Sequence, residues 1–179
     1  MGKRPNVLLI IADQFRGDLL GTGTLGQVAR LPALQNLMQD AVTFPHHFST
    51  VSPCGPSRAS LLTGQYAMNH RVVRNGTPLR HDTPNLATEA RKGGYDPLLF
   101  GYTDSARDPR MLDPLDPRLQ TFEERMPGFT EALRMRMNSD DQIWRDHLAA
   151  KGVDLAPFPD CYRPVGGTLT GPACYPAED

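Results

Sequence analysis

The feature that most constrains the fold is an unbroken apolar run near the N-terminus, Val-Leu-Leu-Ile-Ile at positions 7–11. A strand with one face in water alternates apolar and polar side chains, whereas a strand covered on both faces is apolar throughout. The run therefore predicts a central strand in a mostly parallel sheet. Asp13 and Gln14 follow it, at the carboxyl end of the predicted strand, where open α/β sheets bind their ligands.

Helix and strand patterns alternate along most of the chain, which predicts a single α/β domain with helices flanking the sheet. Apolar spacing and end signals predict helices over residues 32–40, 57–63 and 84–92. Gly64 closes the second of these, and Thr83 or Asp82 is the expected N-cap of the third. The remaining stretches predict strands at 42–48 and 96–102, a loop at 103–127, one or two helices at 128–151, and irregular structure from 152.

Composition narrows the functional class. The 179-residue chain has a formal net charge of −1, which gives no basis for a nucleic-acid or anionic-membrane partner. The apolar stretch at 7–12 is too short for a secretory signal or a membrane span, so a cytoplasmic protein is expected. The three cysteines form no C-x-x-C pair, and a disulfide between Cys161 and Cys174 is left open.

The segment TVSPCGPSRASLLTGQY, residues 50–66, places Cys54 just before a predicted helix. The free N–H groups and the dipole at a helix N-terminus favour an anion. Arg58 lies four residues further along (58 − 54 = 4), so a nucleophile and a guanidinium would point at one tetrahedral oxyanion. From these two residues alone, a buried structural cysteine or a redox thiol is the simpler interpretation. A tyrosine-phosphatase loop is excluded because it needs a longer gap between cysteine and arginine.

The stretch CGPSRASLLTG resembles the signature of the sulfatase family, C-x-P-S-R-x-x-x-L-T-G, and PNVLLIIADQFRGD is similar to the family's opening strand. The resemblance runs from Pro5 to about Arg110 and implies an alkaline-phosphatase-like α/β fold. It implies that a formylglycine-generating enzyme oxidises Cys54 to Cα-formylglycine. The hydrated aldehyde then has one hydroxyl to attack the ester and a second that lets the adduct collapse.

The second apolar strand indicates the branch of the family. Sulfatases usually follow this strand with a Lys and a His, whereas YDPLLFGYTDSARDPR has neither. This segment resembles the corresponding sequence of phosphonate monoester hydrolases and related phosphodiesterases. The same branch is indicated by the MNHR motif within CGPSRASLLTGQYAMNHRVVRNGTPL. The resemblance implies a metal-dependent hydrolase of small anionic esters. An arylsulfatase is the alternative within the family.

The resemblance also implies roles for individual residues. Asp13, Gln14 and Cys54 would hold one divalent cation, and hard oxygen ligands suit Ca²⁺, Mn²⁺ or Mg²⁺. Arg58 would balance the charge of the nucleophile, and Asn75 and Tyr102 would line the substrate pocket. Plainer interpretations stand beside these. Asp13-Gln14 could cap a strand, Asn75-Gly76 is a turn dipeptide, and Tyr102 could be strand-end packing.

Asp104 departs from the pattern, because the resemblance predicts a neutral Thr at this substrate-binding position. A carboxylate beside an anionic substrate is unfavourable unless it is paired, and Arg107 and Arg110 are the nearest candidates in sequence. The histidines are expected to be structural, with His70 in MNHR a further candidate for the pocket.

Complete members of the family are considerably longer than 179 residues. Their remaining metal ligands, and a Lys and a His that act on the substrate, have no convincing counterpart after Arg110. The chain is therefore expected to be the N-terminal part of one sulfatase-type catalytic domain, incomplete at its C-terminus and inactive alone, with family-variable loops and helices over 111–179. A non-catalytic remnant or accessory domain is the alternative, and a homo-oligomer is compatible with the sequence.

Overall fold

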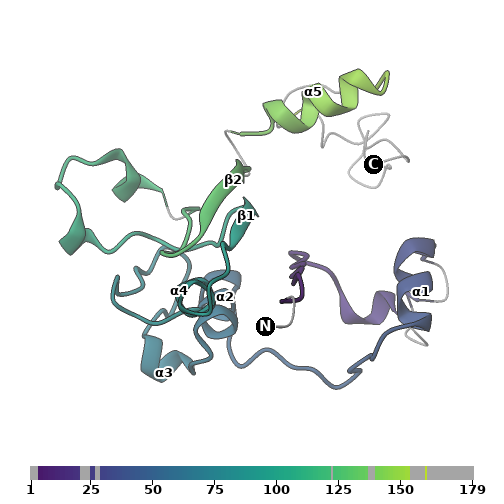
Figure 1. The fold of residues 1–179 in the computed structure, drawn as a ribbon, viewed down its shortest axis with the longest axis horizontal. Coiled ribbons are helices and arrows are strands. Elements are labelled where there is room, and N and C mark those ends of the chain that lie inside the picture. The colour runs from purple at the N-terminus through teal and green to yellow at the C-terminus, as the bar shows by residue number, and fades with distance from the viewer. Residues whose placement is uncertain are drawn as a thin grey trace. The chain divides into compact units, whose positions relative to one another are not determined.

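The computed structural model describes residues 4–20, 25–26, 29–121, 123–136, 140–153 and 160. Within it the chain divides into two compact units, Met1–Ser49 and Thr50–Asp179, and each is described by itself (Figure 1). Cys161 and Cys174 lie outside the described residues, as does most of the tail predicted to be irregular.

Among its described residues, the first unit contains a 3₁₀ turn, η1 (Gly17–Leu19), and one helix, α1 (Pro32–Gln39). Helix α1 confirms the predicted helix. Its first residue is proline, whose missing N–H has no partner in a first helical turn and whose φ already suits a helix. The strand predicted at 42–48 is wrong, because these residues form no strand in the structure.

The prediction of a covered central strand at 7–11 is also wrong for this structure. The run is extended but belongs to neither strand of the described sheet, and its side chains are 39% to 84% exposed. An apolar pattern states which side chains favour burial, but burial also needs neighbouring strands to pair with. None of the described residues of the first unit supplies such a strand.

The second unit is built on helix α2 (Cys54–Thr63), which contacts α3 (Ala67–His70) and α4 (Leu86–Lys92). The helix predicted at 57–63 is confirmed and begins three residues earlier, and Gly64 ends it in the left-handed conformation at φ 69°. The buried core under it consists of Ala59, Leu62, Val72, Leu79 and Met126, with Phe129 packed against them.

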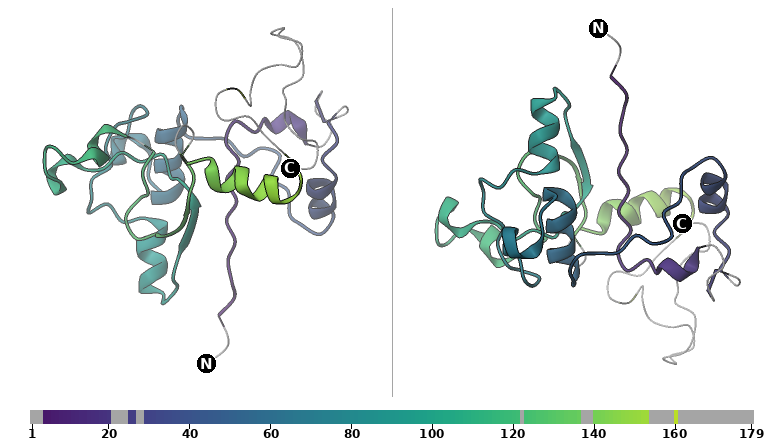
Figure 2. Two further views of the ribbon diagram at one scale, coloured as in Figure 1. Left: turned by 90° about the horizontal axis from the view of Figure 1, so that it is seen from above. Right: turned by 90° about the horizontal axis from the view of Figure 1, so that it is seen from below.

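Strand β1 (Leu98–Gly101) pairs in parallel with β2 (Thr130–Arg134), and Figure 2 shows α4 beside these strands in both views. The pair confirms the predicted parallel α/β class and the strand within 96–102. The prediction of one or two helices within 128–151 is confirmed in its second part and missed a strand in its first. Its first part is β2, and only α5 (Gln142–Ala150) is helical.

Helix α4 is fixed by a capping box on Asn85, not by Thr83 or Asp82. The Asn85 side chain accepts from the N–H groups of Ala87 and Thr88, and the Thr88 hydroxyl accepts from the Asn85 N–H over 2.9 Å. The sequence places the cap too early because Asp82 and Thr83 are equally good capping residue types.

The connection over 103–127 is a loop, as predicted, with two 3₁₀ turns, η2 (Pro109–Met111) and η3 (Pro117–Gln120). Its two arms are joined at Thr103, whose hydroxyl donates to the Glu124 carbonyl over 2.9 Å and accepts from the Met126 N–H over 2.7 Å. This join fixes the segment that leaves β1.

Among the described residues, no helix has the length and apolar character needed to cross a bilayer.

Candidate active site

Cys54 is the first residue of α2, and the hydrogen bond from the Ser57 N–H to the Pro53 carbonyl begins the helix. The helix is held in place because Ala59 and Leu62 are buried in the core. The side chain of residue 54 therefore has a fixed position at the end of a helix dipole, where an anion is favoured. The structure confirms the predicted place of Cys54 at the N-terminus of a helix.

Asn75 holds residue 54 through both ends of its amide. Its Nδ2 donates to Cys54 Sγ over 3.0 Å, and its Oδ1 accepts from the Gly55 N–H over 2.9 Å. Gly55 is part of the arrangement, since a Cβ there would lie 3.0 Å from Asn75 Oδ1 and 3.3 Å from Asn75 Cα. Sequence reasoning missed Gly55, because a glycine inside a helix signals close approach but does not name the neighbour.

Arg58 is oriented by the residue that follows β1. One guanidinium nitrogen, Nη1, donates to the Tyr102 carbonyl over 3.4 Å, and the guanidinium lies 5.1 Å from the centroid of the Tyr102 ring. A guanidinium over an aromatic face is favourable by about 0.5–1 kcal/mol at an exposed site. The sequence predicted a role for both residues, and the structure brings them together. Their assignment to charge balance and substrate binding stays a prediction.

Asp104 lies beside Cys54 with its side chain buried. It is 4% exposed, has a left-handed backbone at φ 56°, and accepts no hydrogen bond on either carboxylate oxygen from the described residues. The suggested pairing with Arg107 or Arg110 is wrong. Arg107 lies 3.8 Å from Glu124, and Arg110 lies 2.6 Å from Asp108.

The environment of Cys54 disfavours its thiolate. Burial raises the pKa of the thiol above its ordinary value, the Asp104 carboxylate raises it further, and the hydrogen bond from Asn75 lowers it. A cysteine used as a thiolate nucleophile or redox group needs the opposite shift. These surroundings disfavour the thiolate that a redox cysteine or an unmodified thiol nucleophile would need.

Asp13 and Gln14 lie in the first unit, directly after the extended apolar run. Gln14 has a left-handed backbone at φ 54°. No group of three or more His, Cys, Asp or Glu side chains within the described parts of the chain could hold a metal ion. The metal set of Asp13, Gln14 and Cys54 thus stays a prediction from sequence.

His70 is a structural residue and not a pocket residue of the Cys54 site. Its Nδ1 accepts from the Val72 N–H over 3.0 Å, so the ring proton is on Nε2, which lies 2.9 Å from Ser60 Oγ. Burial lowers the pKa of the imidazole. The neutral ring ties the end of α3 to α2.

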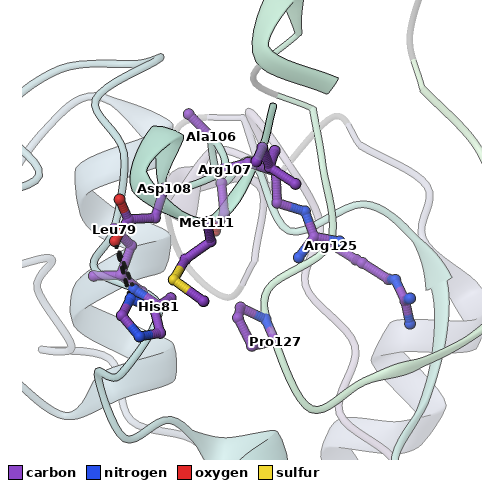
Figure 3. A pocket seen from close by; sticks show the side chains of 10 residues that line it. Leu79, His81, Ala106, Arg107, Asp108, Met111, Arg125 and Pro127 are labelled. Atoms are coloured by element: carbon purple, nitrogen blue, oxygen red, sulfur yellow. Dashed lines mark hydrogen bonds and ion pairs between the residues drawn. The ribbon is translucent and has the colours of Figure 1, made fainter. Parts of the chain in front are cut away.

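A small cavity of about 60 Å³ lies on another part of the second unit (Figure 3). His81 is at its edge and bonds the buried Asp108 carboxylate through its backbone N–H and Nδ1, over 3.1 Å and 3.2 Å. The Arg110 guanidinium beside Asp108 holds the pKa of that carboxyl far below its usual range. None of the predicted site residues lines this cavity. Its polar groups fix the loop that follows Asp104.

Comparison with known proteins adds to this geometry. The family model described as Sulfatase matches residues 5–114. The chain is 45% identical over 186 residues to the multifunctional alkaline phosphatase superfamily protein PehA of Trinickia caryophylli. The alignment covers 98% of this chain and 36% of PehA. It is 31% identical over 98 residues to choline-sulfatase of Rhizobium meliloti, covering 55% of this chain.

Two solved structures of similar fold are phosphonate monoester hydrolases. SpPMH from Silicibacter pomeroyi has a TM-score of 0.84 and 55% identity, covering 98% of this chain and 35% of its own. The enzyme of Agrobacterium radiobacter has a TM-score of 0.79 and 49% identity, covering 92% of this chain and 32% of its own. The chain thus spans roughly a third of the length of these relatives. Its parallel strands and flanking helices are part of the alkaline-phosphatase-like fold, and the chain belongs to the sulfatase family.

Proposed function

We propose that this chain is the N-terminal part of a metal-dependent hydrolase that cleaves phosphonate monoesters or phosphodiesters, with formylglycine at position 54 as its nucleophile. The observation that carries the proposal is the double hydrogen bond of Asn75 to Cys54 and Gly55 at the N-terminus of α2. This bond holds a reactive side chain at the positive end of a helix, where an attacked phosphoryl group gains charge stabilisation.

The surroundings of residue 54 fit formylglycine better than cysteine. The Asn75 amide presents a donor to the side chain, and an oxygen accepts an N–H bond better than sulfur does. When present, formylglycine supplies an oxygen nucleophile together with the second hydroxyl that cysteine and serine lack. Asn75 would orient it, and Arg58, held by Tyr102, would balance developing negative charge.

The donor types also fit a hard cation. Asp13 and Gln14 offer a carboxylate and an amide oxygen, ligands typical of Ca²⁺, Mn²⁺ and Mg²⁺ and unlike the nitrogen and sulfur ligands of zinc. The cation would supply Lewis-acid stabilisation of the transferred group. Gln14 and Asp104 both have left-handed backbones, and such strain in non-glycine residues is concentrated at functional sites.

The comparisons favour phosphonate esters over sulfate esters. The two phosphonate monoester hydrolases are 55% and 49% identical to this chain over almost all of it, whereas the sulfatases are 30% to 34% identical over little more than half. The segment after β1 reads YTDSAR and lacks the Lys and His that true sulfatases use there. An arylsulfatase is therefore the second candidate.

Mass spectrometry of the protein from its native host tests the proposal. The peptide containing Cys54 is expected to be about 18 mass units lighter than the unmodified sequence, as conversion to the aldehyde requires. The same preparation should hydrolyse an aryl phosphonate ester faster than an aryl sulfate. A reversed preference would support the arylsulfatase, and an unmodified thiol without hydrolysis would support a non-catalytic domain.

A further inference from the structure

The carboxylate of Asp104 has no role in the proposed hydrolysis, although it is buried beside the reactive residue. Both of its oxygens are buried, and neither accepts a hydrogen bond or forms an ion pair in the part of the chain that the structure describes. Removing a carboxylate from water is costly unless it gains a partner, so such a group is retained at a site for a reason. It lies beside the side chain of residue 54, where the ester would react.

Electrostatics determines what this carboxylate does to a ligand. The repulsion between two charges is proportional to each of them and grows as the effective dielectric falls. At a buried site, the repulsion energy between this carboxylate and a doubly charged group is about twice that between the carboxylate and a singly charged ester. A phosphonate monoester, a phosphodiester and a sulfate ester each carry one negative charge, whereas a phosphate monoester carries two near neutral pH.

We propose that Asp104 sets the charge selectivity of the site, so that singly charged esters are accepted and doubly charged phosphoryl groups are rejected. The inference rests on the proposed function and names its substrate class more closely. Arg58, or a divalent cation, attracts both kinds of ligand and does not abolish the effect. With a neutral residue at position 104, the site would be one unit of charge more positive.

The backbone keeps the carboxylate in place. Thr103, the preceding residue, is fixed to Glu124 and Met126, and the Asp104 carbonyl lies against Gly55, 3.5 Å from the position of an added Cβ. Asp104 itself is at φ 56°, a conformation that Asp and Asn adopt more readily than β-branched residues. The neutral Thr expected from the family resemblance would be strained here, which makes Asn the matched neutral substitution.

Isothermal titration of the protein from its native host tests this with one substrate-like and one product-like anion. Methyl methylphosphonate carries one charge, and methylphosphonate carries two at a pH above its second pKa. Asp104→Asn is expected to raise the affinity for the doubly charged anion, relative to the singly charged one, by at least about tenfold. The control Asp82→Asn removes an exposed carboxylate that pairs with Arg80, and should leave the ratio unchanged. If Asp104→Asn does not fold, Asp104→Gly removes the same charge and suits the same φ.

An unchanged ratio in a folded Asp104 variant would overturn the inference alone. Binding of neither anion by wild type and variant would overturn it together with the proposed function. A shifted ratio in a protein with an unmodified Cys54 and no esterase activity would support the charge selectivity and contradict the hydrolase.

Discussion

Asn75 contacts Cys54, which lies 21 positions earlier in the sequence (75 − 54 = 21), with 3.0 Å between Asn75 Nδ2 and Cys54 Sγ. The contact depends on the short loop from α3 to the turn at Asn75, which His70 and Val72 anchor to α2 and the core. Residue 54 is held by packing as well as by its place in the helix.

Substituting Asn75 should separate the two roles of its amide. Asn75→Ala removes the donor to residue 54 and leaves the Gly55 N–H without its acceptor, which should lower the free energy of unfolding by about 1–3 kcal/mol. Asn75→Asp keeps an acceptor for Gly55 and should cost less stability. Both variants lose the donor and, in the protein from its native host, should slow ester hydrolysis by about 100-fold. Urea unfolding and hydrolysis of an aryl phosphonate ester measure the two effects, and equal stability losses would contradict the assignment of Oδ1.

Gly55→Ala should reduce activity with little change in stability. The added Cβ would lie 3.0 Å from Asn75 Oδ1, so the amide must move by a few tenths of an ångström. A displaced catalytic group lowers the rate, here by about tenfold, while the gain of about 0.5–1 kcal/mol from replacing a helical glycine is offset by this crowding. Gly17→Ala is the control, since its Cβ would meet nothing within 4 Å. Full activity of Gly55→Ala would show that Asn75 has more freedom than its contacts indicate.

Gly128→Ala should destabilise the second unit by about 3 kcal/mol or more, through backbone strain and overpacking. Gly128 has φ 97°, and an added Cβ would lie 2.8 Å from the Thr88 N and 3.1 Å from the Ala87 carbonyl carbon, both in the first turn of α4. Gly101→Ala is the matched control, because Gly101 has φ 100° with nothing within 4 Å. It should show the strain alone, about 1–2 kcal/mol. Equal losses in thermal or urea unfolding would mean that the clash relaxes.

The sequence predicted where Cys54 and Arg58 lie on helix α2, because short-range signals determine this placement. Cys54 and Arg58 are one helical turn apart, and Gly64 ends the helix as expected. The sequence could not predict that Asp104 is left without the partner suggested for it, because its two neighbouring arginines pair with Glu124 and Asp108. Those pairings depend on how the loop folds back.

Strand β2 shows why other parts of the fold were mispredicted. Its sequence, TEALR, contains good helix formers and no clear alternation, so local propensity favours a helix. Pairing with β1 overrides this preference, with a bulge between Leu99 and Phe100 where the register shifts. The opposite error occurs at 7–11, where the pattern favours a covered strand but the described residues provide no pairing. In both cases a distant partner, and not the local sequence, decides the outcome.

The buried imidazole of His70 should make the stability of the second unit depend on pH. Burial lowers its pKa in the folded state below the ordinary value of about 6.5, because removal from water disfavours the charged ring. Below that pH the unfolded chain binds more protons than the folded one, so the free energy of unfolding falls as the solution is acidified. Above it, this contribution is fully present.

His70→Gln should reduce that slope. Glutamine lacks the titrating ring, so the variant is expected to lose about 1 kcal/mol for a weakened hydrogen bond at neutral pH and then to change less than wild type on acidification. Urea unfolding at a series of pH values measures both quantities. His46→Gln, which removes an exposed histidine of the first unit, is the control and should keep the His70-dependent slope. A wild-type slope in His70→Gln would contradict this prediction and would assign the acid sensitivity to other groups. The Asp108 carboxylate is distinguishable from His70 by its pH range. Arg110 lowers its pKa, so its stabilising effect is lost only at much lower pH.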